Sequence, residues 1–542
     1  MATIVLLATS TIGWQEVRSG IVGNDNTGIT PYDVVLVFLT LGYVANSIAA
    51  SGFVRYLVHL VLRKSSTVGH RLYLYLYLSF FGLGMFIGND PIMLLFLSSL
   101  TKVTANVRHP RAWVHTQFAI ANVATGVLVS SNPTNLVLAG AFNIKFVGYM
   151  TNMIVPTVVT SLLLFPYLLY IIFHDESLIP SMIEVYALPD EIRNRPPVNI
   201  NIPFGRGEFE YEDEVKERRN PEAIQFDIEP ILNPWLSRKS AVAGSAVMVA
   251  SVVILLALNA VYLSRGGNTD FWVTLPAAFF MVCSTNAGPD NGETVRSADV
   301  ASRSNEEVVK AMEAPPEASV RRALTNLGLS GSSSLERKDF GKERVTLVAL
   351  LQDGYVWLRE TFTTTTVAAT YLPWDIIPFA FSMFTLVEAL VSKGWMPVFG
   401  RGWDWWATHT GVVGSIAGMG FLGAVLSNIA GTNIGACILM SQVIKSWQDI
   451  HRMNGIPISD RLFWGSVYSL SIGVNYGAFS LSISASLTGI MWRTVLNKEG
   501  RRLGKLEFAR VNLPMIAMAM LIACSVLVAQ VHITRSAAPY DA

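Results

Sequence analysis

Long apolar stretches alternate with short polar ones along most of the chain. In the first half they cover 31–62, 72–100, 114–142, 149–173, 241–263 and 271–283. In the second half they cover 372–391, 410–443, 462–492 and 513–531. A helix crosses a bilayer with about 20 mostly apolar residues, and most of these runs approach or exceed that length. The pattern predicts an all-α polytopic membrane protein.

The run over 72–100 is interrupted by Asn89-Asp90-Pro91 and has basic residues on both sides. Basic flanks mark the cytoplasmic face, so both ends are expected on the same side of the membrane. A helix of this length rises about 44 Å, too little for two crossings of a core about 30 Å thick. We therefore expect a re-entrant hairpin with Asn89 and Asp90 at its tip. The interruption over 427–433 predicts a second one.

The run over 114–142 is interrupted by a polar segment, 130–135. Pro133 has no N–H and breaks a continuous helix. Asn132 is a good N-cap, and proline suits the first helical position after it. We expect two half-helices here. The freed N–H groups of Thr134, Asn135 and Leu136, at the positive end of the second half-helix, would then form a seat for an anion.

Three landmarks recur later in the chain at nearly one offset. Pro31-Tyr32-Asp33 is echoed by Pro373-Trp374-Asp375 (373 − 31 = 342). The hairpin asparagines Asn89 and Asn428 give 339 (428 − 89), and Asn132 and Asn475 give 343 (475 − 132). The expected topology puts the two copies in opposite orientations. We predict two inverted repeats, each with a re-entrant hairpin and a discontinuous transmembrane helix, a pattern typical of secondary transporters.

The same pattern sets the expected boundaries. We predict a mobile N-terminal tail over 1–30, transmembrane repeat 1 over 31–173 and a disordered cytoplasmic loop over 174–238. Connecting transmembrane helices follow over 239–283 and a second disordered cytoplasmic loop over 284–344. Transmembrane repeat 2 covers 345–533, within which 345–371 has no secure assignment, and a C-terminal tail covers 534–542.

The polar interruptions resemble those of a known superfamily. The segments that carry the likeness are 86–91, 131–136, 427–428 with 431–435, and 473–477. They are similar to the ion transporter superfamily, and within it to citrate transporter-like and arsenical pump membrane proteins, including fungal members with long cytosolic loops. The resemblance implies alternating access by movement of a transport domain against a scaffold. It also implies substrates from di- and tricarboxylates to arsenite, or sodium and protons in related antiporters.

Candidate ligands for the substrate or coupling ion lie at the four interruptions. In repeat 1 they are Asn89, Asp90, Ser131, Asn132, Thr134 and Asn135. In repeat 2 they are Ser427, Asn428, Gly431, Thr432, Asn433, Asn475 and Gly477. The four asparagines Asn89, Asn132, Asn428 and Asn475 form a candidate sodium site. We expect the Asp90 carboxylate to lie inside the membrane. A charged group there is costly, so we take a functional role as the first hypothesis for Asp90. An N-cap beside Pro91 is the structural alternative for it.

Composition narrows the class of protein. Of 542 residues, 51% are hydrophobic and 15% charged, against about a quarter charged in soluble domains. A net charge of +1 gives no indication of a nucleic-acid partner. The cysteines and histidines show no metal-binding spacing, so we expect no cofactor and no metal centre. The coupling ion would be Na⁺ or H⁺. Partners would be the lipid bilayer and a small anion, and the sequence leaves a homodimer open.

Secondary active transport of a small anion, a carboxylate such as citrate or an oxyanion such as arsenite, is therefore the leading hypothesis. The anion would be coupled to H⁺ or Na⁺. A Na⁺/H⁺-type antiporter using Asp90 is the alternative. A channel would instead give flux that is not coupled to an ion gradient. An intramembrane enzyme would need a nucleophile–base pair or a metal-binding motif, and this sequence shows neither. The sequence predicts a multi-pass integral membrane protein without resolving which membrane.

Overall fold

The computed structural model describes most of the chain. The described residues are 2–23, 30–65, 68–89, 111–182, 231–261, 271–286, 362–430, 432–498 and 503–540, except 371, 373 and 375, together with the single residues 93, 97, 100, 197, 354 and 358. Within them the chain is helical, and β pairing is limited to two single bridges. This agrees with the predicted all-α class. Asp90 and Gly431, two of the candidate ligands, lie outside the described residues.

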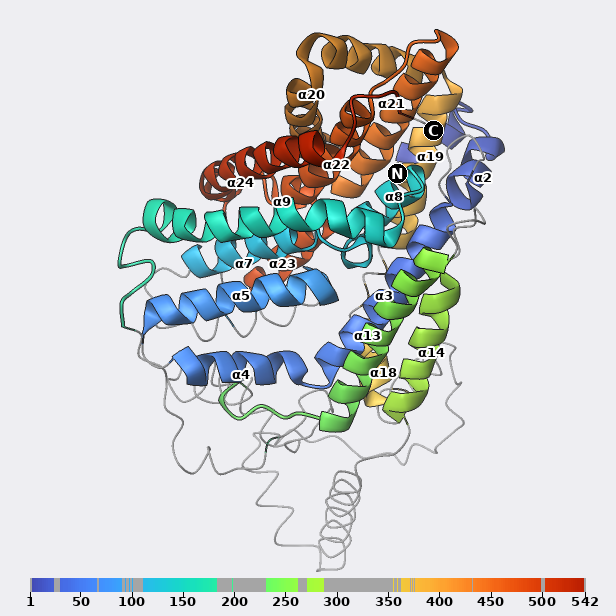
Figure 1. The fold of residues 1–542 in the computed structure, drawn as a ribbon. Coiled ribbons are helices and arrows are strands. Elements are labelled where there is room, and N and C mark those ends of the chain that lie inside the picture. Colours follow the sequence, from blue (N-terminus) through green and yellow to red (C-terminus); the bar gives the residue numbers. More distant parts are fainter. Residues whose placement is uncertain are drawn as a thin grey trace, which may run out of the picture.

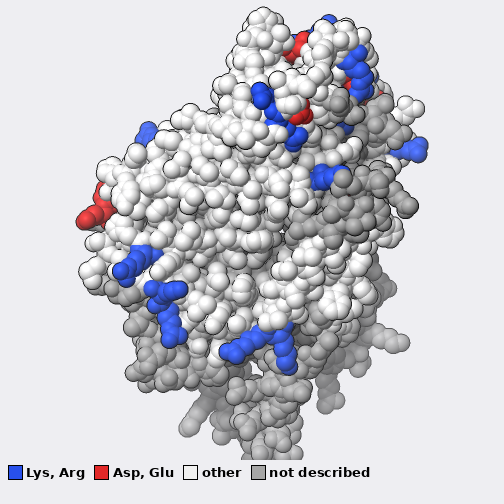
Figure 2. All heavy atoms as spheres, viewed as in Figure 1, with Lys and Arg blue, Asp and Glu red and all other residues white. Residues whose placement is uncertain are grey.

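Several helices suit a bilayer by length and composition. Among the described residues, four are long and apolar enough to cross one: Pro31–Ala50, Phe146–Ile172, Met396–Ile429 and Lys505–Thr534. In Figure 2, charged side chains gather near the top and toward the lower left, and a broad uncharged surface lies between them. Charged side chains are costly in hydrocarbon, so this surface suits contact with lipid tails.

The first repeat begins with a helix that is apolar all round and ends with a long crossing helix. Its elements are α3 (Pro31–Ala50), α4 (Phe53–Ser65), α5 (Gly69–Ile87), α7 (Arg111–Ala124), η1 (Val129–Ser131), α8 (Pro133–Ala141), α9 (Phe146–Tyr167) and η2 (Leu168–Ile172). The helix α5 is the first arm of the predicted hairpin. It ends at Gly88, whose φ of 89° favours glycine, and Asn89 follows it, buried.

The elements of the second repeat end in the order seen in the first: a helix, a short 3-10 helix, a further helix and a long helix. They are α18 (Thr363–Thr370), α19 (Ile376–Ser392), α20 (Met396–Ile429), α21 (Asn433–Met453), α22 (Asp460–Gly477), η4 (Ile483–Ala485), α23 (Leu487–Lys498) and α24 (Lys505–Thr534). A backbone break at Gly411 divides α20, and Figure 1 shows the helix turning over there. The helices α20 and α21 pack against one another, and Asp404, before Gly411, accepts a bond from the Trp447 indole of α21 at 3.0 Å. That pair is the predicted second hairpin.

The repeats correspond through their breaks. The short helix η4 begins 354 positions after η1 (483 − 129), and α23 begins 354 positions after α8 (487 − 133). Asn122 in the last turn of α7 and Asn475 in the last turn of α22 are 353 apart (475 − 122). Both donate to the carbonyl four residues earlier. Asn132 and Asn475, paired in the sequence by an offset of 343, therefore occupy different places: Asn475 precedes its break, and Ser486 takes the capping position before α23.

Two helices connect the repeats and form a smaller core with the start of each. They are α13 (Arg238–Val261) and α14 (Phe271–Asn286), and they pack against α3 and α18. Figure 1 shows these four helices side by side. Val44 and Met281 are fully buried in this core. The α18 helix, from the segment that had no assignment, accepts a bond from Asn46 at its Ala368 carbonyl.

The N-terminal segment differs from the predicted mobile tail. It forms α1 (Ala2–Ala8) and α2 (Trp14–Val22), and α2 packs against α19. Glu16 accepts a bond from the Gly13 N–H at 2.8 Å and another from Ser392 at 3.2 Å. Gly20 allows the close approach, because a Cβ there would lie 2.7 Å from the Thr385 backbone. Contact with α19 thus accompanies helix formation in a segment whose own hydrophobicity is weak.

The loop predicted over 174–238 is structured at its two described edges. Leu178 accepts a bond from the Trp113 indole at 3.0 Å, and Ile179 is buried. At the other edge, Ser237 donates to the Ser51 carbonyl at 3.0 Å. Packing against the transmembrane helices holds both edges. The rest of this loop, and 287–344 of the second, lie outside the described residues.

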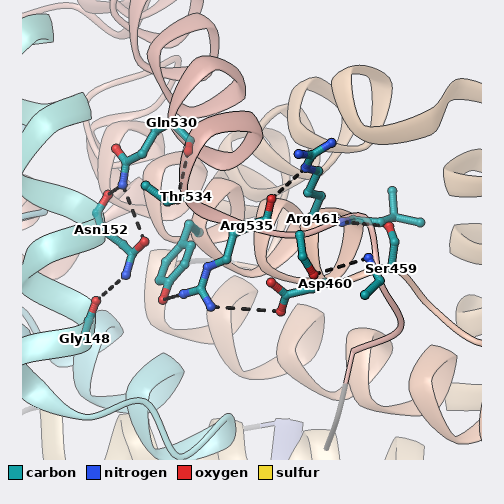
Figure 3. A network of polar contacts seen from close by, with 12 residues as sticks. Gly148, Asn152, Ser459, Asp460, Arg461, Gln530, Thr534 and Arg535 are labelled. Carbon is teal, nitrogen blue, oxygen red and sulfur yellow. Dashed lines mark hydrogen bonds and ion pairs between the residues drawn. The ribbon is translucent and has the colours of Figure 1, made fainter.

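The C-terminal segment is tied to the start of α22 (Figure 3). Arg535 donates to the Tyr468 hydroxyl at 3.3 Å and lies 4.7 Å from the centre of the Trp464 ring. Arg461 donates to the Arg535 carbonyl at 2.8 Å. Nearby, Gln530 of α24 donates to the Asn152 carbonyl of α9 at 3.0 Å. These bonds link α9, α22 and α24.

Candidate functional site

The first broken helix has the predicted geometry. The helix α7 ends at Ala124 and α8 begins at Pro133. Asn132 between them is extended, with φ −150° and ψ 135°, and its side-chain oxygen accepts the Thr134 N–H at 3.2 Å. The N-cap prediction is confirmed. Buried non-helical backbone needs partners, and the Ser131 hydroxyl, with one hydrogen to donate, lies 2.8 Å from the carbonyls of both Thr125 and Leu128.

The expected anion seat at the start of α8 is occupied by Asn132 itself. Its carbonyl accepts the N–H of Asn135 at 3.0 Å and that of Leu136 at 3.5 Å. Its side chain takes the N–H of Thr134. The prediction that these three N–H groups are free was therefore wrong, because the cap satisfies them. The Thr134 hydroxyl is buried and has no hydrogen-bond partner within the described part of the chain.

Three asparagine side chains join the two broken helices, and we call them the amide junction: Asn132, Asn135 and Asn475. Asn132 donates to the Asn475 amide oxygen at 2.9 Å. Asn475 donates to the Asn135 amide oxygen at 2.8 Å. Their exposed fractions are 3%, 1% and 0%. The junction thus connects the cap of α8 to the last turn of α22 in the core of the protein.

Backbone carbonyls fix the orientation of these amides. Asn135 uses both amide hydrogens, toward Thr125 at 2.7 Å and Leu128 at 2.8 Å. Asn475 gives its second hydrogen to the Ser471 carbonyl at 2.9 Å. A flipped amide would lose these bonds, so the donor–acceptor order along the junction is set. All its direct partners that the structure describes are uncharged.

The hairpin tips bond to the broken helices through asparagines. Asn89 donates to the Asn122 amide oxygen of α7 at 3.1 Å. Asn428 donates to the Ser480 hydroxyl at 2.7 Å and accepts the Ser482 N–H at 2.9 Å, both in the break after α22. Each tip therefore bonds within its own repeat, while the amide junction bridges the repeats.

Close backbone contacts bring hairpins and breaks together. A Cβ on Gly88 would lie 2.9 Å from the Ser131 carbonyl, and one on Gly477 would lie 2.8 Å from the Ser427 hydroxyl. Across the repeats, the Cys437 thiol of α21 donates to the Thr134 carbonyl of α8 at 3.3 Å. The starts of α8 and α21 are thus adjacent. Thr134, in the interruption over 130–135, therefore lies next to Cys437, four positions after the interruption over 427–433.

Thr432 and Asn433 form the start of α21. The Thr432 side chain accepts the Gly435 N–H at 3.4 Å and acts as its N-cap. Both residues are buried, as is Ser427, whose hydroxyl donates to the Gly423 carbonyl at 2.7 Å. Thr432 therefore has the same role at α21 as Asn132 has at α8: its polar side chain caps a helix that starts in the protein interior.

The candidate sodium ligands are divided among separate contacts. Asn89 bonds to Asn122, Asn428 to the serines after α22, and only Asn132 and Asn475 bond to one another. Within the described residues no group of three or more His, Cys, Asp or Glu side chains could hold a metal ion. A sodium ion coordinated by all four asparagines therefore remains a prediction.

Sequence patterns missed several polar residues at this centre. Tyr149 of α9 contacts Ser471 at 2.6 Å, and Cys437 contacts α8. Each lies alone inside an apolar run, where a single polar side chain gives no pattern. Ser486 accepts the Gly489 N–H at 2.9 Å, and a capping search of 478–486 would have found it.

The comparisons with known proteins identify the family. The sequence model described as citrate transporter (CitMHS) matches residues 1–464. The chain belongs to the citrate transporter family. It is therefore a multi-pass integral membrane transporter and not an enzyme. The match ends before Asn475, so the part of the amide junction on α22 is defined by the structure alone.

The other comparisons do not narrow the family or the function further. No curated protein matches this citrate-family chain. The crystal structure of the Alcanivorax borkumensis YdaH transporter, which reveals an unusual topology, matches with a TM-score of 0.42 and 12% identity. The match covers 96% of this chain and 88% of that one. A TM-score this low carries no argument about the citrate-family chain, and its fold rests on the elements described above.

Proposed function

We propose that this chain is a secondary active transporter of a small carboxylate anion such as citrate, coupled to H⁺ or Na⁺. One observation carries the proposal: the broken helices of the two repeats meet through three buried amides at the centre of a citrate-family membrane protein. Polar breaks at matching positions of two repeats are typical of transporter binding sites. Arsenite belongs to the same set of candidate anions.

The chemistry of the centre suits an anion held without a fixed cation. The Thr134 hydroxyl is a buried donor without a partner among the described residues, and the bond to Asn475 uses one of the two Asn132 amide hydrogens. The N-terminal ends of α8 and α21 are adjacent and add positive dipole ends. A co-bound Na⁺ or H⁺ would neutralise part of the anionic charge. That requirement links anion binding to the coupling ion.

Alternating access needs a surface along which helices can move. A small apolar pocket lies between α3 and α19 on one side and α8 and α21 on the other. Its lining is apolar throughout, from Val34 and Phe38 of α3 to Pro133 and Ile434 beside the broken backbone. Apolar surfaces without hydrogen bonds across them resist sliding less than polar ones. We infer that α8 and α21 move against α3 and α19.

Uptake into vesicles tests this function. Purified full-length protein in liposomes would receive labelled citrate, succinate or arsenite, with an inward Na⁺ gradient, an inward H⁺ gradient or neither. We expect one of these anions to accumulate, and only with a gradient. No gradient-dependent uptake of any of the three would contradict the proposal.

The alternative is a cation/proton antiporter in which Asp90 exchanges the ions. Its distinguishing result is Na⁺-driven proton flux in vesicles that contain no anionic substrate. The Asp90→Asn variant separates the two further, since it removes the exchangeable proton while retaining the shape of the side chain. Unchanged ion and pH dependence in this variant would exclude Asp90 from coupling.

A further inference from the structure

A second layer of hydrogen bonds lies behind the amide junction. The Tyr149 hydroxyl of α9 contacts the Ser471 hydroxyl of α22 at 2.6 Å. Their exposed fractions are 0% and 1%. Ser471 lies one helical turn before Asn475, on the same side of α22. The contact therefore reaches the junction from a helix that supplies none of its amides.

Ser471 offers two acceptors to the Asn475 amide. Its carbonyl lies 2.9 Å and its hydroxyl oxygen 3.5 Å from the Asn475 nitrogen. In this arrangement the carbonyl takes one amide hydrogen, and the other points to Asn135 at 2.8 Å. The Tyr149 contact occupies the Ser471 hydroxyl and holds it in one rotamer. Without Tyr149, that hydroxyl could turn to compete for Asn475 or to bond the preceding helical turn.

We propose that Tyr149 is a positioning residue for the substrate site, acting through Ser471 and Asn475. It keeps the Asn475 amide directed at Asn132 and Asn135, and so fixes the donors and acceptors that an anion meets. This inference rests on the proposed function, because it assigns Tyr149 to the affinity of that same site. Tyr149 contacts the junction through Ser471 and is not itself a ligand.

The test compares three variants in liposomes with labelled citrate. Tyr149→Phe and Ser471→Ala each remove one side of the contact. Tyr77→Phe is the matched control, since its buried hydroxyl also makes a 2.6 Å bond, to the Ser161 carbonyl, which bonds to none of the three junction asparagines. In Tyr149→Phe and Ser471→Ala we expect KM to rise about five- to tenfold, the effect of one lost hydrogen bond. Vmax should stay within about twofold of the wild-type value. The double variant should add little to either.

Two results would overturn the inference. One is an unchanged KM in Tyr149→Phe. The other is an equal rise in Tyr149→Phe and Tyr77→Phe, which would indicate loss of general packing. If the wild-type protein takes up no citrate, the proposed function fails and the contact is tested by melting temperature. Tyr149→Phe and Asn475→Ala should then be non-additive, and additive effects would refute the coupling.

Discussion

Asparagine chemistry explains why the centre can be both buried and polar. An amide carries two donor hydrogens and an acceptor oxygen, so neighbouring amides can satisfy one another's hydrogen-bonding groups without a charged residue. Asn475 uses all of these groups, toward Asn132, Asn135 and the Ser471 carbonyl. A buried group left without a partner would cost about 1–3 kcal/mol. The junction therefore stabilises the fold as well as shaping the site.

Replacing Asn475 tests this residue directly. In Asn475→Ala, the Asn132 amide hydrogen and the Asn135 amide oxygen lose their partner. We expect a loss of about 1–3 kcal/mol in stability and uptake below about one-tenth of wild type. Thermal melts and vesicle uptake measure the two. Asn152→Ala, a half-buried asparagine bonded to Gln530 of α24, serves as the control and should retain most uptake.

Residue-level prediction from the sequence succeeded where a residue has a local role. The Asn132 cap follows from the adjacent Pro133, and local spacing is enough to find it. The bond from Asn132 to Asn475 crosses the repeats, and a pattern within one segment cannot show it. The N–H groups after Asn132 were expected to be open, although the same local cap satisfies them.

At the scale of elements, close helix packing around the breaks depends on glycine. A Cβ on Gly473 would overlap the Gly420 carbonyl oxygen and lie 3.0 Å from the Gly420 Cα. The nearest atoms are backbone, so α20 and α22 could not relax without moving apart. Small residues permit this approach in membrane helices. The second hairpin and the second broken helix are thus held against one another.

Gly473→Ala should separate α20 from α22. We expect a loss of about 1–3 kcal/mol in stability from overpacking, with uptake strongly reduced. Gly402→Ala is the control, because a Cβ there would have no atom within 4 Å and alanine favours the helix. Equal melting temperatures for the two variants would contradict the packing argument.

Element boundaries were predicted better than element equivalence. Within the described residues, the first arm of the first hairpin ends, and both breaks fall, where apolar runs are interrupted. The offset of 343 between Asn132 and Asn475 was misleading, since it matched residue type and not position relative to a break. The starts of α8 and α23, 354 positions apart (487 − 133), give the structural offset. An asparagine is common enough in polar breaks to match by chance.

At the scale of the whole molecule, the C-terminal segment fastens α24 to the start of α22 (Figure 3). Tyr540 stacks on Phe463 with ring centres 4.0 Å apart, and its N–H donates to the Ile458 carbonyl at 2.7 Å. Burial and the nearby Asp460 carboxylate both raise the pKa of the Tyr540 hydroxyl. The fastening was not predicted from the sequence, because its contacts join residues at least 67 positions apart.

Arg535→Ala should loosen this fastening. The variant loses the bond to Tyr468 and the contact with the Trp464 ring, together about 1–2 kcal/mol. We expect faster hydrogen exchange over 536–540 and at the start of α22. Arg493→Ala, at an exposed position of α23, should leave exchange there unchanged. Equal exchange in both variants would show that Arg535 does not hold the segment.

A map of the purified protein with bound citrate tests the central claim most directly, because it locates the anion independently of transport rates. The account predicts density for the anion within hydrogen-bond distance of Thr134 and of the amide junction, between the starts of α8 and α21. Citrate bound elsewhere, with the three asparagines still bonded only to one another, would contradict it.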